Sequence, residues 1–211
     1  MTLSPTTLKS ANLRPATLNP MTFKFIARRL TVAAVVLTFA LVSNLYAGEV
    51  AGVTMPDSVQ VGSTNLVLNG MGLRTKIVVK VYVAGLYLPR KSDDGDAIVK
   101  ADAPKRLVMH FVRDLSKNQI ADAFKDSIND NAGEVRKAEG ANIEKFLAAM
   151  EAVKSGDEMA FTYIPDGGTT FAINGKDKLT LPGLGFSQAL FSVWLGPKPP
   201  TSGLKKGLLG R

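Results

Sequence analysis

The chain of 211 residues contains no cysteine, one histidine and one tryptophan. Without cysteine it forms no disulfide, no thiolate zinc site and no thiol nucleophile. A single histidine excludes every site that needs two imidazoles. The sequence predicts no cofactor, and a metal site built on thiolates or on paired imidazoles is excluded.

Acidic residues are absent from the first part of the chain, so much of the net charge of +8 comes from this part. Residues 1–47 carry five bases and no acid, whereas residues 48–195 carry 17 bases and 18 acids. The body of the protein is thus close to neutral. A broad basic face is the usual electrostatic footprint of nucleic-acid binding, so no nucleic-acid partner is predicted.

Residues 1–47 are predicted to form a leader that contains a secretory signal peptide. The uncharged stretch LTVAAVVLTFALV (30–42) follows Arg28-Arg29 and precedes a short segment that ends at Ala47. A basic flank, a short apolar run and a small residue at the cleavage point are typical of such a peptide. The run is short for a transmembrane helix, which needs about 20 apolar residues.

The leader fixes the expected domain organisation and location. Met21 begins a complete signal peptide by itself and is an alternative start. Residues 48–211 then form one exported, periplasmic domain, and the membrane is a partner only for export. The alternative is a protein that stays anchored by an uncleaved N-terminal helix.

Strand patterns dominate both ends of residues 48–211. Residues 59–68 are strand-like, Asn69-Gly70 is a strong hairpin signal, and residues 74–88 form the longest alternating pattern. Gly85 interrupts that pattern and suggests a bulge, which would bring Tyr87 to the face of Tyr82 and Arg74. Residues 107–112, 158–164, 169–173 and 178–181 are further strands.

Helices are predicted in the middle and at the end. Ser116 and Gln119 form a capping-box pattern before a helix whose apolar residues recur at i, i+4 and i+8. Further helices are predicted at 143–153 and 186–195, and a short segment of unassigned type follows at 204–209. The order predicts an α+β fold with an antiparallel sheet and helices grouped on one side.

Several strings together resemble the bacterial members of the chalcone isomerase-like family. They are LNGMGLRTK (68–76), KVYVAGLYL (80–88), PKR (104–106) leading to FVR (111–113), TFAINGK (170–176), WLGP (194–197) and LKKGLLG (204–210). The resemblance implies an open-faced β-sandwich, in which a layer of helices covers one face of a large antiparallel sheet above a ligand cleft. The family contains plant isomerases that close chalcones to flavanones, and relatives that bind fatty acids or have no known catalysis.

The resemblance also implies a ligand-binding set of Arg74, Tyr82 and Tyr87. Arg74 matches a family arginine that contacts an anionic group, a task for which the guanidinium fork is suited. Tyr82 or Tyr87 matches a tyrosine that assists it, and both are kept because the strand register is open. Arg74 as a surface residue and each tyrosine as a core residue are the structural alternatives.

Enzymatic activity is not favoured, and no catalytic residue is assigned. The plant isomerases also use a Tyr and an Asn from a helix over the cleft, but residues 116–132 contain no Tyr, and Asn118, Asn129 and Asn131 do not align with that Asn. His110 and the acidic cluster Asp93, Asp94 and Asp96 are more typical of a strand surface and a solvated turn than of metal ligands.

The leading hypothesis is an exported, non-catalytic protein that binds a hydrophobic or amphiphilic small molecule with an anionic head, such as a fatty acid. The alternatives are a chalcone isomerase-type intramolecular lyase and a structural or partner-binding envelope protein whose cleft is filled by its own side chains. The ligand, the oligomeric state and any protein partner stay open.

Overall fold

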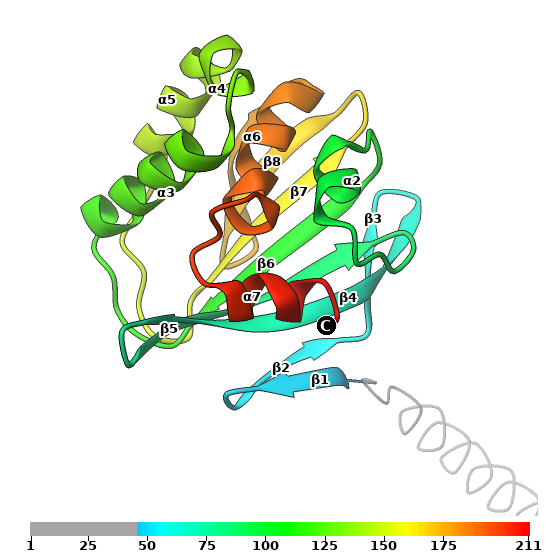
Figure 1. Cartoon of the computed structure of the whole chain (residues 1–211), viewed down its shortest axis with the longest axis vertical. Coiled ribbons are helices and arrows are strands. Elements are labelled where there is room, and N and C mark those ends of the chain that lie inside the picture. Colours follow the sequence, from blue (N-terminus) through cyan, green and yellow to red (C-terminus); the bar gives the residue numbers. More distant parts are fainter. Residues whose placement is uncertain (1–45) are drawn as a thin grey trace, which may run out of the picture. The chain divides into compact units, whose positions relative to one another are not determined.

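The computed structural model describes residues 46–211 (Figure 1). The predicted leader lies outside these residues except for its last two positions. The described residues form one compact unit. Within the described part of the chain, no helix is long and apolar enough to span a membrane.

A seven-stranded antiparallel sheet is the framework of the domain. Its strands pair in chain order as a meander. They are β3 (Ser58–Val61), β4 (Thr64–Lys76), β5 (Val79–Leu88), β6 (Lys105–Phe111), β7 (Glu158–Ile164), β8 (Gly168–Ile173) and β9 (Lys176–Leu181).

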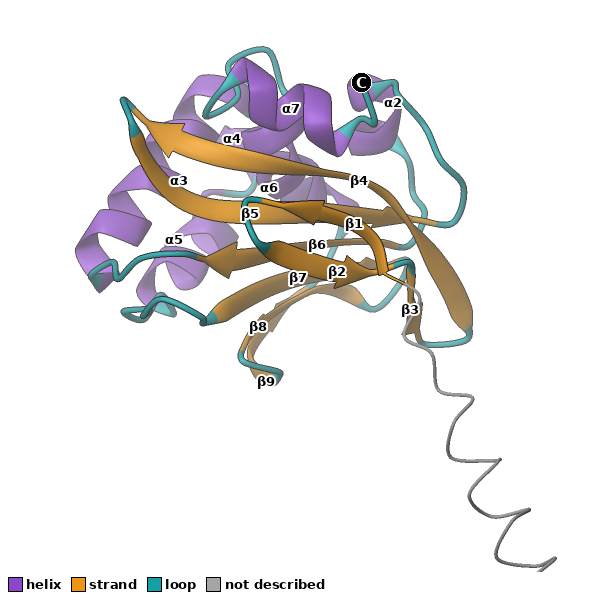
Figure 2. Cartoon of the chain, turned by 90° about the horizontal axis from the view of Figure 1, so that it is seen from below, coloured by secondary structure: helices purple, strands orange, loops and turns teal. Residues whose placement is uncertain are grey.

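Helices occupy one face of this sheet (Figure 2). They are α2 (Gly95–Lys100), α3 (Lys117–Asn131), α4 (Val135–Ala138), α5 (Gly140–Ala148), α6 (Leu184–Leu195) and α7 (Ser202–Leu208). The predicted α+β fold, an open-faced sheet covered on one face by helices, is confirmed.

Two apolar cores form, one on each face of the sheet. The larger lies under the helices and includes Phe124, Phe146, Phe161 and Trp194, whose rings meet mostly edge to face. The smaller lies on the other face, where a hairpin of β1 (Tyr46–Val50) and β2 (Val53–Pro56) contributes Met55. The sequence did not predict this hairpin.

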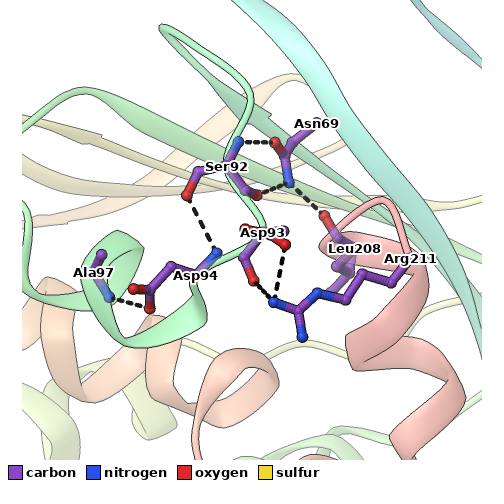
Figure 3. Close-up of polar contacts among 7 residues, drawn as sticks. All are labelled: Asn69, Ser92, Asp93, Asp94, Ala97, Leu208 and Arg211. Atoms are coloured by element: carbon purple, nitrogen blue, oxygen red, sulfur yellow. Dashed lines mark hydrogen bonds and ion pairs between the residues drawn. The ribbon is translucent and has the colours of Figure 1, made fainter.

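The predicted hairpin at Asn69-Gly70 is wrong, because β4 runs through both residues. Asn69 is a bulge in the pairing of β4 with β5, and the chain reverses at Ile77 and Val78 instead. The Asn69 amide donates to the carbonyl oxygens of Ser92 (2.9 Å) and Leu208 (2.8 Å), and its oxygen accepts from the Ser92 N–H at 2.7 Å (Figure 3). These distant contacts use the side chain that would otherwise favour a turn.

Gly70 of β4 and Gly207 of α7 allow α7 to lie directly on β4. A Cβ on Gly70 would overlap the carbonyl oxygen of Gly207, and one on Gly207 would overlap that of Met71. The strings at 68–76 and 204–210 are therefore two sides of one backbone contact.

The predicted bulge at Gly85 is also wrong. Gly85 pairs regularly with Met71 of β4 and Val108 of β6. Its missing side chain makes room for the sulfur of Met55, which a Cβ would overlap. The irregularity in β5 lies at Val81, between the pairs of Arg74 with Tyr82 and of Thr75 with Lys80.

The predicted helices are present with shifted bounds, whereas the short helices α2, α4 and α7 were not predicted as helices. Both hydrogen bonds of the capping box between Ser116 and Gln119 are present at the start of α3. The helix predicted at 143–153 ends at Ala148, because Val153 forms a β-bridge with Leu115 instead. That bridge ties the segment after α5 to the start of α3.

Candidate functional site

A cavity of about 530 Å³ lies between the sheet and the helices α3 and α6. Its floor is apolar and largely buried, and its mouth is polar and exposed. The floor comprises Val81, Tyr82, Met109, Phe111, Ile120, Phe124, Val193 and Trp194. The mouth comprises Lys76, Arg113, Gln119, Asp122 and Asp126. Its volume falls in the usual range of about 300–1,000 Å³ for small-molecule sites.

Arg74 lies in this cavity near the free end of β4. It is paired with Tyr82 across the β4–β5 ladder, and its guanidinium carbon lies 5.6 Å from the centroid of the Tyr82 ring. None of the ion pairs found in residues 46–211 involves Arg74. Its Nε is buried and has no hydrogen-bond partner among these residues. A buried donor without a partner is costly, so Arg74 is suited to receive an acceptor from a ligand.

Tyr82 lies beside Arg74 with its hydroxyl group in the buried interior. The indole Nε1 of Trp194 donates a hydrogen bond of 3.0 Å to this hydroxyl oxygen. Burial raises the pKa of Tyr82 above 10.0, although the Arg74 charge and the bond from Trp194 oppose the rise. The hydroxyl therefore stays protonated at neutral pH, and its own hydrogen is available for an acceptor in the cavity.

The charges at the mouth are divided between its walls. Lys76 and Arg113 belong to the sheet end that also holds Arg74, whereas Asp122 and Asp126 belong to α3. Both aspartates are exposed to solvent. The positive end of the cavity is thus the strand end, and an anionic group is favoured there rather than against α3.

Tyr87 is not brought together with Arg74. Without a bulge at Gly85, β5 alternates strictly from Tyr82 to Tyr87, and Tyr87 belongs to the core on the opposite face of the sheet. Its hydroxyl donates to the carbonyl oxygen of Pro56 at 3.1 Å. Of the three residues predicted as ligand-binding, the structure brings together Arg74 and Tyr82.

The remaining polar candidates have structural partners. Asp94 caps α2 by accepting from the Ala97 N–H, and Asp93 pairs with Arg211 at 3.1 Å (Figure 3). His110 lies 3.3 Å from Glu158 on the neighbouring strand. Within the described residues, no three His, Cys, Asp or Glu side chains are grouped as metal ligands.

Several cavity residues were missed by the sequence interpretation. Trp194 belongs to the predominantly apolar helix α6, where no strong periodicity singles out one face. Arg113 ends the FVR string and Lys76 ends the LNGMGLRTK string, so the resemblance includes both residues but gives neither a role. Their convergence depends on the pairing of β4, β5 and β6, which the sequence alone does not fix.

Comparisons with known proteins agree with this architecture. Residues 47–210 match the family described as chalcone isomerase-like. The chain belongs to the chalcone isomerase-like family. A search of curated protein sequences found no match.

Among solved structures, this chalcone isomerase-like chain is similar to a fatty-acid binding protein of Arabidopsis thaliana. The TM-score is 0.61 at 16% sequence identity, and the alignment covers 75% of this chain and 92% of the plant protein. At this identity the similarity establishes the shared fold. The function has to be argued from the cavity itself.

Proposed function

We propose that the domain is a non-catalytic binding protein for an amphiphile with an anionic head and an apolar tail, of the fatty-acid type. The observation that carries the proposal is the position of Arg74, a cation with a buried and unpartnered Nε, at one end of a cavity with an apolar floor. Charge-assisted hydrogen bonds from a guanidinium to a carboxylate are among the strongest available to a protein.

Each part of the cavity has a task in this proposal. Arg74 donates to the head group, and the Tyr82 hydroxyl adds a second, neutral donor. Lys76 and Arg113 attract the anion at the mouth. The tail packs against Phe111 and the other apolar, largely buried residues of the cavity floor. The fatty-acid binding neighbour with the same fold supports this ligand class.

The alternatives make different demands on the cavity. A protein whose cleft is filled by its own side chains would leave no space beside Arg74, which disagrees with the cavity found there. A chalcone isomerase-type lyase remains the catalytic alternative. Among the described residues that line the cavity, α3 supplies no Tyr or Asn, and an absorbance assay of chalcone cyclisation tests this alternative directly.

Native mass spectrometry of the purified protein tests the binding proposal. A copurified amphiphile with a carboxylate or another anionic head is expected, and Arg74→Ala is expected to lose most of it. Arg106→Ala is the matched control. Arg106 is also a strand arginine with a buried, unpartnered Nε, but it lies outside the cavity and contacts Thr162. Equal ligand occupancy in both variants would remove Arg74 from the proposed role.

Export is a separate part of the proposal. The basic and apolar composition of residues 1–47 supports secretion to the periplasm with cleavage after Ala47. N-terminal sequencing of protein from a periplasmic extract tests it: a chain that begins at Gly48 is expected, and a chain that retains residues 30–42 in the membrane fraction would indicate an anchor instead.

A further inference from the structure

The free end of the β4–β5 hairpin exposes apolar side chains that the fold does not need. Ile77 is 94% exposed and Val78 is 86% exposed. Together with Val79 they make up three of the four large hydrophobic residues exposed in the described part of the chain. An apolar cluster of this kind on a surface marks an interaction site more often than isolated exposed residues do.

The backbone conformation of this turn is unusual as well. Ile77 has a φ of 60°, in the left-handed region that favours Gly, Asn or Asp. For a β-branched residue this conformation is a genuine outlier. Neither turn geometry nor core packing accounts for Ile at this position, since its side chain points into solvent.

Lysines flank the apolar turn on both strands. Lys76 and Lys80 are exposed, and the pairs of Lys76 with Val79 and of Thr75 with Lys80 place them on the last two rungs of the ladder. No acid occurs between Arg74 and Tyr82. Neither lysine is part of an ion pair found in residues 46–211.

The exposed apolar residues of this turn and the lysines beside them are together complementary to an anionic lipid surface. Apolar side chains enter the boundary between head groups and acyl chains, while lysines next to them are attracted by anionic head groups. Apolar insertion and electrostatic attraction add to each other in interfacial binding, and the hairpin combines both within residues 76–80.

The free end of the β4–β5 hairpin also adjoins the cavity. Arg74 and Lys76 line the cavity, and Ile77 directly follows Lys76 on the chain. At about 3.3 Å per strand residue, Arg74 lies only about 10 Å from the turn. A hairpin seated in a bilayer therefore holds the mouth of the cavity close to the lipid head groups.

We propose that residues 76–80, here called the hairpin tip, dock the domain on a bilayer that contains anionic lipid. The sequence alone predicts contact with a membrane only during export, so this is a second membrane contact, made by the folded domain. The exchange of an amphiphile between bilayer and cavity rests on the proposed function, but the docking itself does not.

The absence of cysteine allows a direct test, because a single introduced cysteine is the only site of thiol labelling. Val78→Cys in the full chain is labelled with an environment-sensitive fluorophore and mixed with vesicles of phosphatidylcholine alone or of equal parts phosphatidylcholine and phosphatidylglycerol. The expected result is a blue shift and protection from an aqueous quencher with the anionic vesicles only. Because the label reports only the surroundings of residue 78, binding through residues 1–47 is distinguished by comparison with a label at a second position.

Ile164→Cys is the matched control, because Ile164 is the fourth exposed hydrophobic residue and lies at the opposite end of the sheet. Its label is expected to stay accessible with both kinds of vesicle. Adding Lys80→Glu to Val78→Cys is expected to weaken the response to phosphatidylglycerol by about tenfold in lipid concentration, which corresponds to about 1.4 kcal/mol.

Three outcomes would overturn the docking proposal. The first is a Val78 label that stays as accessible to the quencher as the Ile164 label. The second is equal protection by neutral and anionic vesicles. The third is protection without vesicles that rises with protein concentration, which would identify the tip as an interface between copies of the chain. Native mass spectrometry of the same labelled protein shows whether the cavity still holds its ligand, so a failure of docking is distinguishable from a failure of ligand binding.

Discussion

The indole Nε1 of Trp194 donates a hydrogen bond of 3.0 Å to the hydroxyl oxygen of Tyr82 across the floor of the cavity. The bond joins α6 to β5, two elements 112 residues apart in the chain. It satisfies a buried indole N–H and orients the tyrosine ring beneath Arg74. Tyr82 thus has a structural task and a proposed binding task at the same atom.

Tyr82→Phe is expected to weaken both stability and ligand retention. Loss of the hydroxyl leaves the buried Trp194 N–H without its acceptor, which costs about 1–3 kcal/mol in the free energy of unfolding. It also removes one donor to the ligand head group. Urea unfolding and native mass spectrometry of the same variant measure the two effects.

Tyr87→Phe is the control for this prediction. Tyr87 is a buried tyrosine of the same strand that loses a single hydrogen bond, to the Pro56 carbonyl, on the other face of the sheet. Its stability is expected to fall while its ligand occupancy is unchanged. A Tyr82→Phe variant with the stability and occupancy of the wild type would show that the hydroxyl has neither task.

Local patterns predicted the fold class well because alternation and helical periodicity report which face of an element is buried. The position of the turn between β4 and β5 escaped this reasoning. Asn69 contacts Leu208, 139 residues away, and no local rule reveals that its amide is used there. The true turn at Ile77 contains none of the residues that ordinarily mark a hairpin, so nothing in the local sequence located it.

The candidate site was predictable only where a family string pointed at a residue. Arg74 and Tyr82 came from such strings, and the ladder pairs them. Tyr87 lies in the same string, but only a bulge at Gly85 would put it on the face of Arg74. A shift of one residue moves a side chain to the other face of a strand, so without this bulge Tyr87 lies on the opposite face. Trp194 was missed because its contact with Tyr82 arises from tertiary packing alone.

The contact of α7 with β4 leads to a paired glycine prediction. Gly203 and Gly207 both lie in α7, and alanine has the higher helix propensity at either position, by about 0.8–1.0 kcal/mol in a helix interior. A Cβ on Gly203 meets nothing within 4 Å, whereas one on Gly207 overlaps the Met71 carbonyl oxygen. Gly203→Ala is expected to maintain or raise the melting temperature, and Gly207→Ala to lower it. Equal shifts in a thermal melt would mean that α7 does not depend on this close approach.

Asn69 is expected to be among the most sensitive polar positions in the fold. Asn69→Ala leaves up to three backbone groups of Ser92 and Leu208 unpaired, at about 1–3 kcal/mol for each one that water does not reach. Asn69→Asp is expected to be worse at neutral pH, since a carboxylate then faces two carbonyl oxygens. Chemical unfolding ranks the variants, with Asn118→Ala on the exposed surface of α3 as a control expected within about 0.5 kcal/mol of the wild type. Asn69→Asp at wild-type stability would contradict the assigned hydrogen bonds.

Lys105 supplies a prediction about pH. It is 1% exposed, and its Nζ donates to the carbonyl oxygens of Ile98 (3.1 Å) and Ala101 (2.6 Å) and lies 5.0 Å from the centre of the Tyr163 ring. Burial lowers the pKa of Lys105 from 10.5 to about 8, and the nearby Asp102 opposes the shift only in part. The folded chain therefore releases this proton more readily than the unfolded chain does.

Between about pH 8 and pH 10.5 the unfolded chain binds more protons at Lys105, so the contribution of this residue to stability rises with pH. Below about pH 8 both states are protonated and the full cost of the buried charge applies. The free energy of unfolding of the wild type, measured relative to Lys105→Met, is expected to rise by up to about 3 kcal/mol from neutral pH to about pH 10.5. The comparison with Lys105→Met cancels Tyr87, whose pKa is raised to about 12 and which destabilises both proteins above about pH 10. Urea unfolding of the two proteins across this range measures the difference, and a difference that stays constant with pH would mean that Lys105 titrates alike in the folded and unfolded chains.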